Sequence, residues 1–105
     1  MYGVPWGAPD DLNTFLAMVN NVPKDWTFSA FSLGRNQMPY VAASVLAGGN
    51  VRVGLEDNLM LEKGVLATNE ALVDKAVNIV ERMGASIIGP EQVREKLNLV
   101  KRSSL

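Results

Sequence analysis

Residues 50–58, NVRVGLEDN, contain most of the side chains in this sequence that could do chemistry. Side chains alternate along a strand, so Arg52 and Gly54 would share one face. An Arg on a buried face is costly unless a carboxylate or a ligand meets it. A carboxylate such as Glu56, directly after the strand, can ligate a divalent metal. Its neighbour Asp57 can act as a base supported by the charge of Arg52.

A purely structural reading of the same residues stays open. Acids that follow a strand often cap a helix or end a sheet edge, and Arg52 could simply complete an ion pair. The carboxyl end of a strand is nevertheless where parallel α/β folds place their sites. Spacing alone therefore leaves the catalytic and the structural interpretation side by side.

Composition narrows the chemistry further. The 105 residues include no His and no Cys, and 10 basic against 11 acidic side chains give a net charge of -1. No imidazole, thiolate or disulfide can act here, and no basic excess indicates a nucleic-acid partner. The longest mainly apolar run, residues 41–47, is far shorter than the roughly 20 residues that span a bilayer. We therefore expect a cytoplasmic protein with neither a membrane nor a nucleic-acid partner.

Hydrophobic periodicity and breaker residues predict the elements that carry this segment. Pro9, Asp10 and Asp11 open a first helix that residues 20–23 stop. The remaining predicted elements are a strand over 26–32, a helix over 38–47, a strand over 51–55, a long connection over 56–68, a helix from an Asn69 N-cap to Met83 with Gly84 as its C-cap, and a helix from Pro90. Two strands joined through a helix form a βαβ unit, so they should run parallel.

The same segment carries a family resemblance. Residues 51–58, VRVGLEDN, resemble the signature near the C-terminus of the beta-keto acid cleavage enzymes, which include the 3-keto-5-aminohexanoate cleavage enzyme of lysine fermentation. Other stretches fall in the order expected of that family and cover nearly the whole chain. They are residues 3–7, Trp26, 34–39, 47–49, 61–64, 68–69 and 72–73.

The resemblance implies an activity. The family is a zinc-dependent TIM barrel that reacts a beta-keto acid with acetyl-CoA, giving acetoacetate and a new acyl-CoA in a retro-Claisen type of cleavage. Glu56 matches the carboxylate ligand of Zn²⁺, Asp57 the general base, and Arg52 the Arg that supports this base. A metal of this kind polarises the oxygens of a keto acid.

Three further residues are expected near the substrate. Asn58 would orient the loop by hydrogen bonds, although a role as a turn-former fits as well. Gly34 and Arg35 follow the preceding strand at the same end of the barrel. Arg35 could meet a CoA phosphate or a substrate carboxylate, and the alternative is a solvated loop Arg.

The resemblance also implies that the chain is incomplete. A TIM barrel takes about 250 residues, so residues 1–105 would be a partial domain: the C-terminal part of a (β/α)8 barrel, about the last three βα units plus a C-terminal helix, with a frayed tail over 100–105. The strands at 51 and 26 would be the eighth and seventh, and residues 2–4 a remnant of the sixth. The family's zinc site needs a His-x-His pair, which this sequence lacks. The chain alone should be inactive.

Two other functions are weighed against this one. The chain could be a non-enzymatic α/β-barrel module that self-associates or pairs with another chain, because its isolated strands and apolar helix would lack cover. A homo-oligomer or a missing N-terminal part would supply that cover. A different metal-using TIM barrel, such as an aldolase, shares the strand-end carboxylates. It does not account for the similarity on both sides of VRVGLEDN.

Overall fold

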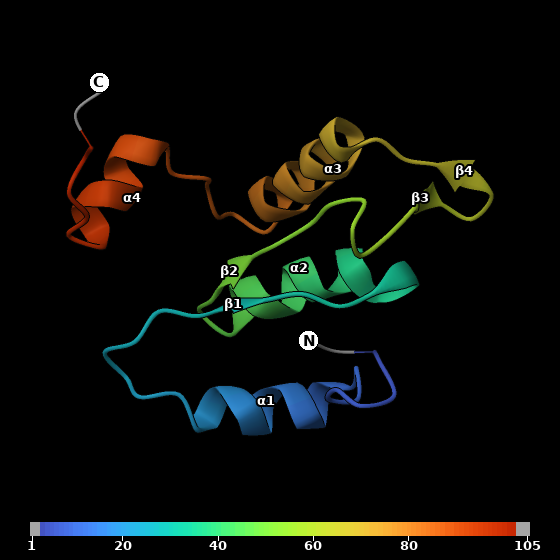
Figure 1. Cartoon of the computed structure of the whole chain (residues 1–105), viewed down its shortest axis with the longest axis horizontal. Coiled ribbons are helices and arrows are strands. Elements are labelled where there is room, and N and C mark those ends of the chain that lie inside the picture. The colour runs from blue at the N-terminus through green and yellow to red at the C-terminus, as the bar shows by residue number, and fades with distance from the viewer. Residues whose placement is uncertain (1–2, 103–105) are drawn as a thin grey trace.

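The computed structural model describes residues 3–102 as a mixed α/β arrangement (Figure 1). A parallel strand pair joined through a helix lies at its centre, and a separate two-stranded hairpin extends from it. The elements are α1 (Leu12–Asn20), β1 (Ser29–Ala30), the 3-10 turn η1 (Gly34–Asn36), α2 (Gln37–Leu46), β2 (Asn50–Val51), β3 (Met60–Glu62), β4 (Val65–Leu66), α3 (Asn69–Arg82) and α4 (Pro90–Lys96).

The predicted βαβ unit is confirmed, but its strands are shorter than predicted. Strands β1 and β2 pair in parallel, with Ser29 opposite Asn50 and Ala30 opposite Val51. The predicted spans of 26–32 and 51–55 each shrink to two residues, since a strand extends only as far as a neighbour hydrogen-bonds with it. Among residues 3–102 each of these strands has one partner. A complete parallel barrel is therefore not observed, and the partial-barrel assignment stays a prediction.

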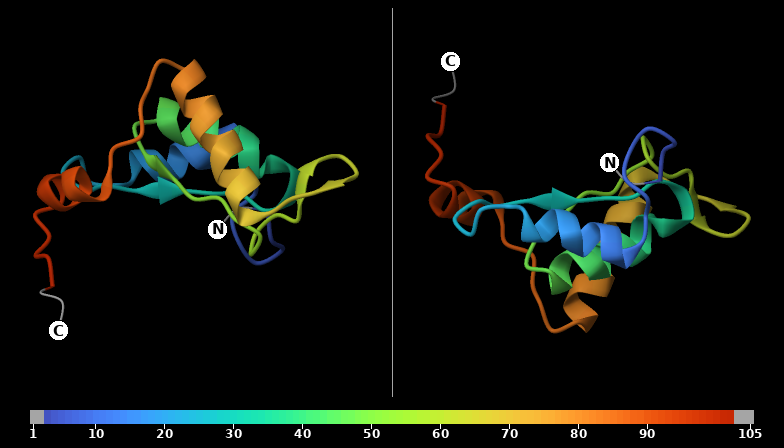
Figure 2. Two further views of the ribbon diagram at one scale, coloured as in Figure 1. Left: turned by 90° about the horizontal axis from the view of Figure 1, so that it is seen from above. Right: turned by 90° about the horizontal axis from the view of Figure 1, so that it is seen from below.

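The helices α1, α2 and α3 gather on one side of this strand pair (Figure 2). Two apolar clusters fill the space between. In the first, Val51 and Val53 pack against a group from α2 and α3 that includes the fully buried Leu72. In the second, Ala30 packs with Phe15 and Tyr40 from α1 and α2. Arg52 alternates with Val51 and Val53 and therefore faces away from the helices.

The helix starts differ from the predicted ones in an informative way. Helix α1 begins at Leu12 and not at Pro9, because Asp11 is its N-cap: the Thr14 N–H donates to the Asp11 carboxylate at 2.8 Å. This hydrogen bond lowers the pKa of Asp11 below 3.8. Helix α3 is capped by Thr68, whose Oγ1 accepts from the Ala71 N–H at 3.1 Å, so the Asn69 cap was wrong.

The helix ends and chain ends differ less. Helix α3 ends at Arg82 with Met83 as its C-cap, so the Gly84 cap was wrong by one residue: Gly84, at a φ of 84°, directly follows the observed cap. Helix α4 begins at Pro90 as predicted. The proposed sixth-strand remnant at 2–4 lies partly outside the described residues, and its residues 3 and 4 are bends. The predicted tail over 100–105 is described only as far as residue 102, without regular structure.

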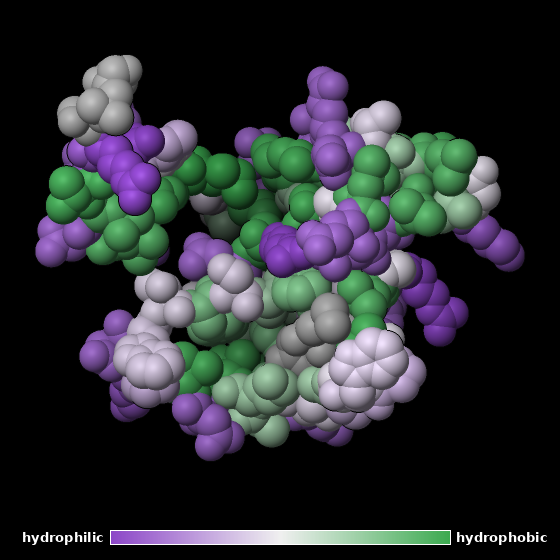
Figure 3. Space-filling view, viewed as in Figure 1, coloured by the Kyte–Doolittle hydropathy of each residue, from purple (hydrophilic) through white to green (hydrophobic). Residues whose placement is uncertain are grey.

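The predicted connection over 56–68 contains a β-hairpin that the sequence did not predict. Strands β3 and β4 pair antiparallel with an irregular register, around a turn that contains Gly64 at a φ of 80°. Strands of two or three residues have no readable alternation. Figure 3 shows apolar side chains at the surface over this hairpin and over α4; Leu66 is 75% exposed. Within residues 3–102, no helix combines the length and apolar character that crossing a membrane requires.

Candidate functional site

The site is a tight turn that follows β2. The Asp57 and Asn58 N–H groups both donate to the Gly54 carbonyl, at 3.2 and 3.1 Å, which closes the turn. The Gly34 N–H, in the loop after β1, donates to the Asp57 carbonyl at 2.8 Å. The loops after the two parallel strands therefore meet at one edge, as the sequence predicts for Gly34 and the acids.

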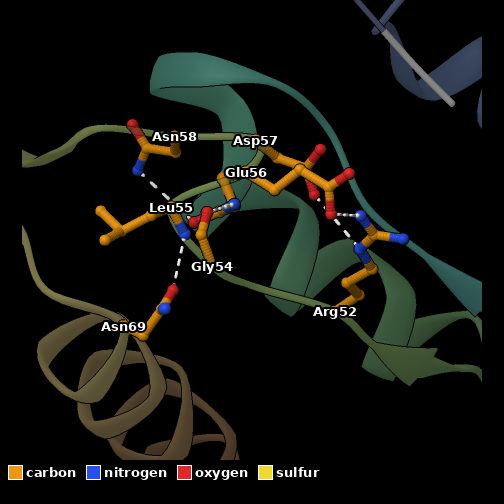
Figure 4. Close-up of polar contacts among 8 residues, drawn as sticks. Arg52, Gly54, Leu55, Glu56, Asp57, Asn58 and Asn69 are labelled. Atoms are coloured by element: carbon orange, nitrogen blue, oxygen red, sulfur yellow. Dashed lines mark hydrogen bonds and ion pairs between the residues drawn. The ribbon is translucent and has the colours of Figure 1, made fainter.

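Arg52 holds both acids of the turn (Figure 4). Its Nη2 lies 2.6 Å from Glu56 Oε2, and its Nε lies 3.2 Å from Asp57 Oδ2. The guanidinium also stacks over the Phe31 ring, 4.6 Å from the ring centroid. Stacking on one side and two carboxylates at its edge leave the guanidinium little freedom to turn. The three side chains singled out from the sequence thus form one cluster.

The two carboxylates occupy different environments. The Glu56 side chain is 82% exposed, whereas that of Asp57 is 6% exposed. Asp57 Oδ2 is buried and accepts no hydrogen bond, because its contact with Arg52 Nε is an ion pair without hydrogen-bond geometry. A buried oxygen that accepts nothing has free lone pairs for a proton or a ligand. The arrangement suits Asp57 as a base and Glu56 as an accessible anionic ligand.

Asn58 uses its side chain within the loop. Its Nδ2 donates to the Met60 carbonyl at 2.7 Å, and its Oδ1 accepts from the Met60 N–H at 3.1 Å. The residue is buried, so both ends of its amide serve the backbone. These contacts match the loop-orienting role predicted for Asn58 and leave its amide engaged within the protein.

Arg35 borders a hollow next to the acids. The hollow has a volume of about 1060 Å³, and its wall includes the exposed Arg35 together with Glu56, Asp57 and Lys63. Gly34 lines the same hollow at a φ of 61°, which favours glycine. The predicted substrate-side residues Gly34, Arg35 and Asn58 thus all lie around one concavity.

Metal-ligating side chains are sparse in the described part of the chain. Across residues 3–102, no group of three His, Cys, Asp or Glu side chains is arranged to hold a metal ion. Glu56 offers a single carboxylate, which is paired with Arg52, whereas a structural or catalytic zinc needs at least three protein ligands.

Three contacts of the site were not anticipated. Phe31, the residue after β1, stacks on Arg52, the residue after β2. Gln37 Nε2 donates to the Gly54 carbonyl at 3.1 Å, and Asn69 Oδ1 accepts from the Leu55 N–H at 2.8 Å. Alternation of side chains along residues 26–32 could have indicated that Phe31 contacts Arg52. No local pattern points Gln37 or Asn69 toward the turn.

The amino-acid sequence matches a known family of enzymes. The chain belongs to the beta-keto acid cleavage enzyme family, whose family model matches residues 1–99. The family resemblance seen in the sequence is therefore confirmed.

Individual relatives extend this result. The chain is 76% identical over 100 residues to the 3-dehydrocarnitine:acetyl-CoA trimethylamine transferase of Rhizobium meliloti, covering 95% of the chain and 33% of that protein. It is 36% identical over 100 residues to the 3-keto-5-aminohexanoate cleavage enzyme of Acetoanaerobium sticklandii, covering 94% and 37%. Against the 3,5-dioxohexanoate:acetyl-CoA acetone transferase of Paraburkholderia graminis it is 42% identical over 77 residues, covering 72% and 25%. The chain thus spans about a third of the length of these first two relatives.

Proposed function

We propose that this chain supplies the strand-end part of an active site in which a beta-keto acid reacts with acetyl-CoA. The observation that carries the proposal is the Arg52, Glu56 and Asp57 cluster at the carboxyl end of a parallel strand pair. The products are acetoacetate and a new acyl-CoA. The keto acid is 3-dehydrocarnitine, the compound named for the relative that is 76% identical.

The reaction requires a base, and Asp57 can act as one. Joining the acetyl group to the carbon between ketone and carboxylate requires the loss of a proton from that carbon. Asp57 has a buried oxygen with free lone pairs, so we assign it this proton, and Arg52 keeps the carboxylate in place. The acetyl carbon loses its bond to the CoA sulfur as it forms the new carbon–carbon bond, and the released thiolate takes the original acyl group as the old carbon–carbon bond breaks. The proton held by Asp57 returns to the carbon of acetoacetate that is left.

For zinc, the proposal assigns one ligand from this chain, the carboxylate of Glu56. The carboxylate is exposed and lies beside the base, so it can serve as one ligand. Because the sequence has no His and residues 3–102 hold no ligand cluster, the other ligands would come from a different segment or chain. A missing N-terminal part would fill this need, whereas a second copy of this chain also has no His and could add only carboxylates.

The remaining residues and the location complete the proposal. Arg35 would meet a CoA phosphate or the substrate carboxylate across the hollow, with Gly34 and Asn58 shaping its wall. A cytoplasmic location belongs to the same proposal, since acetyl-CoA, named for these relatives, is an intracellular metabolite. The proposal also includes the fold: residues 1–105 form one domain that is part of a TIM barrel.

A chimera tests this function. In the chimera, this chain replaces the matching third of the sequence of the Rhizobium meliloti relative. We expect acetoacetate from acetyl-CoA and 3-dehydrocarnitine, and none from the 105-residue chain alone. A folded chimera without activity would overturn the proposed function. Zinc-dependent activity of the chain alone would refute the requirement for residues beyond it.

A second function is supported by exposed apolar side chains. Leu46 is 85% and Trp26 67% exposed, although the rest of α2 is better covered than predicted, with Met38, Tyr40 and Val41 buried. A non-enzymatic module that self-associates would cover these groups. Analytical ultracentrifugation of the chain distinguishes a defined oligomer from a monomer, and an inactive chimera beside a defined oligomer would favour this second function.

A further inference from the structure

The turn that carries the acids is held largely by side chains from outside it. Strand β2 ends at Val51, before the turn begins. Within the turn, two N–H groups share the single carbonyl of Gly54. A turn with so few bonds of its own is easily displaced unless neighbouring elements hold it. Figure 4 shows Asn69 reaching the turn from the first residue of α3.

The Asn69 side chain hydrogen-bonds with the turn and not with its own helix. Thr68 already caps α3, so the Asn69 amide is free of capping. Its Oδ1 accepts from the Leu55 N–H at 2.8 Å. Gly54 permits this approach, because a Cβ added at Gly54 would lie 3.3 Å from Asn69 Oδ1. A close contact of this kind fixes the distance between α3 and the residue before Glu56.

Gln37 holds the same turn from α2. Its side chain is fully buried, and its Nε2 donates to the Gly54 carbonyl at 3.1 Å. Its Oε1 lies 3.4 Å from Asn58 Nδ2, at the other end of the turn. A buried amide with partners at both ends resists displacement, because moving it would leave polar groups unpaired.

We propose that Asn69 and Gln37 are positioning residues that set the Glu56–Asp57 pair through the backbone of the turn. Helices α2 and α3 pack against each other, so the two amides act as anchors on one helix pair. The geometry of the acids therefore depends on the packing of α2 on α3. The catalytic meaning of this inference rests on the proposed function, whereas the anchoring itself does not.

Two substitutions at one position separate anchoring from general stability. Asn69→Asp keeps an oxygen that can accept from the Leu55 N–H, and a carboxylate suits a helix start. Asn69→Ala removes the acceptor and leaves the Thr68 cap intact. Asn78→Ala is the matched control, because Asn78 lies in the same helix and its Nδ2 donates only to the Asp74 carbonyl.

Amide hydrogen exchange on the full chain tests the anchoring without any activity. We expect the Leu55 amide to be protected in the unchanged chain, in Asn69→Asp and in Asn78→Ala. In Asn69→Ala its exchange should be faster by about tenfold, the effect of losing one net hydrogen bond. An unprotected Leu55 amide in the unchanged chain, or equal protection in Asn69→Ala, would overturn the inference.

Kinetics of the chimera test the effect on the acids. Asn69→Ala should lower kcat by roughly 10- to 100-fold, the effect of a misplaced catalytic group, with KM for acetyl-CoA unchanged. Asn69→Asp should restore kcat. A kcat that is unaltered in Asn69→Ala, or equally low in both variants, would contradict the positioning role. A chimera inactive before any substitution would refute the proposed function, while hydrogen exchange would still decide the anchoring.

Discussion

Arg52 Nε lies 3.2 Å from Asp57 Oδ2, an oxygen that is buried and accepts no hydrogen bond. The ion pair fixes where the carboxylate lies without saturating its lone pairs. Arg52 in turn is held by Glu56 and by the Phe31 ring. One guanidinium therefore contacts an exposed acid and a buried one, and the two carboxylates lie in different environments.

Asp57→Asn tests the buried acid. Asparagine fills nearly the same space but cannot take up a proton, so activity of the chimera should fall by roughly 10²- to 10⁴-fold. Steady-state acetoacetate formation measures the loss, and Glu56→Gln is the comparison. Glu56→Gln should lower bound zinc, measured by elemental analysis, whereas Asp57→Asn should leave it unchanged. Full activity in Asp57→Asn would rule out Asp57 as the base.

Arg52→Lys tests the shared guanidinium. A lysine keeps the charge but cannot meet two carboxylates from a planar edge or stack in the same way on Phe31. We expect kcat of the chimera to fall by roughly tenfold or more, since the acids lose their fixed separation. Thermal stability should change little, because the Glu56 end of the pair is exposed. An unchanged kcat would argue for a solely structural Arg52.

Much of the site could be predicted from local sequence signals. Two apolar runs with a helix between them, residues 26–32 and 51–55, predict a pair of parallel strands. The acids after the second run predict an ion pair with Arg52. Parallel pairing and the Arg52 contacts were then observed. These features depend on alternation and chain order, which a single sequence carries.

Other features depend on contacts between distant residues. Strand length follows from neighbouring strands, so the two-residue β1 and β2 could not be read from composition. Asn69 has the chemistry of an N-cap, yet Thr68 takes that position and frees the Asn69 amide for Leu55, 14 residues earlier. Gln37 shows no periodic signal that would direct it to Gly54.

Gly49→Ala tests the packing of the residue before β2 against Phe28, the residue before β1. A Cβ at position 49 would lie 2.2 Å from the Phe28 ring, which must then move. Overpacking of this kind costs about 1–3 kcal/mol, so the free energy of unfolding from urea denaturation should fall by that amount. The same substitution in a Phe28→Ala background is the control, because the added Cβ then meets no ring. An equal loss of stability with and without the ring would contradict the packing described for Phe28.

The cap of α1 should make stability depend on pH. The hydrogen bond from the Thr14 N–H lowers the pKa of Asp11 in the folded chain below 3.8, the ordinary value of an Asp carboxyl, which we take for the unfolded chain. The stabilising contribution is therefore fully present above that pH and is lost as the pH falls through the lower, folded value. Asp11→Asn keeps an acceptor that does not titrate. The unfolding free energy of the unchanged chain should exceed that of Asp11→Asn near neutral pH, and the difference should shrink below pH 3.8. Urea denaturation of both chains across this range provides the measurement, and a difference independent of pH would show that Asp11 does not cap α1 as a carboxylate.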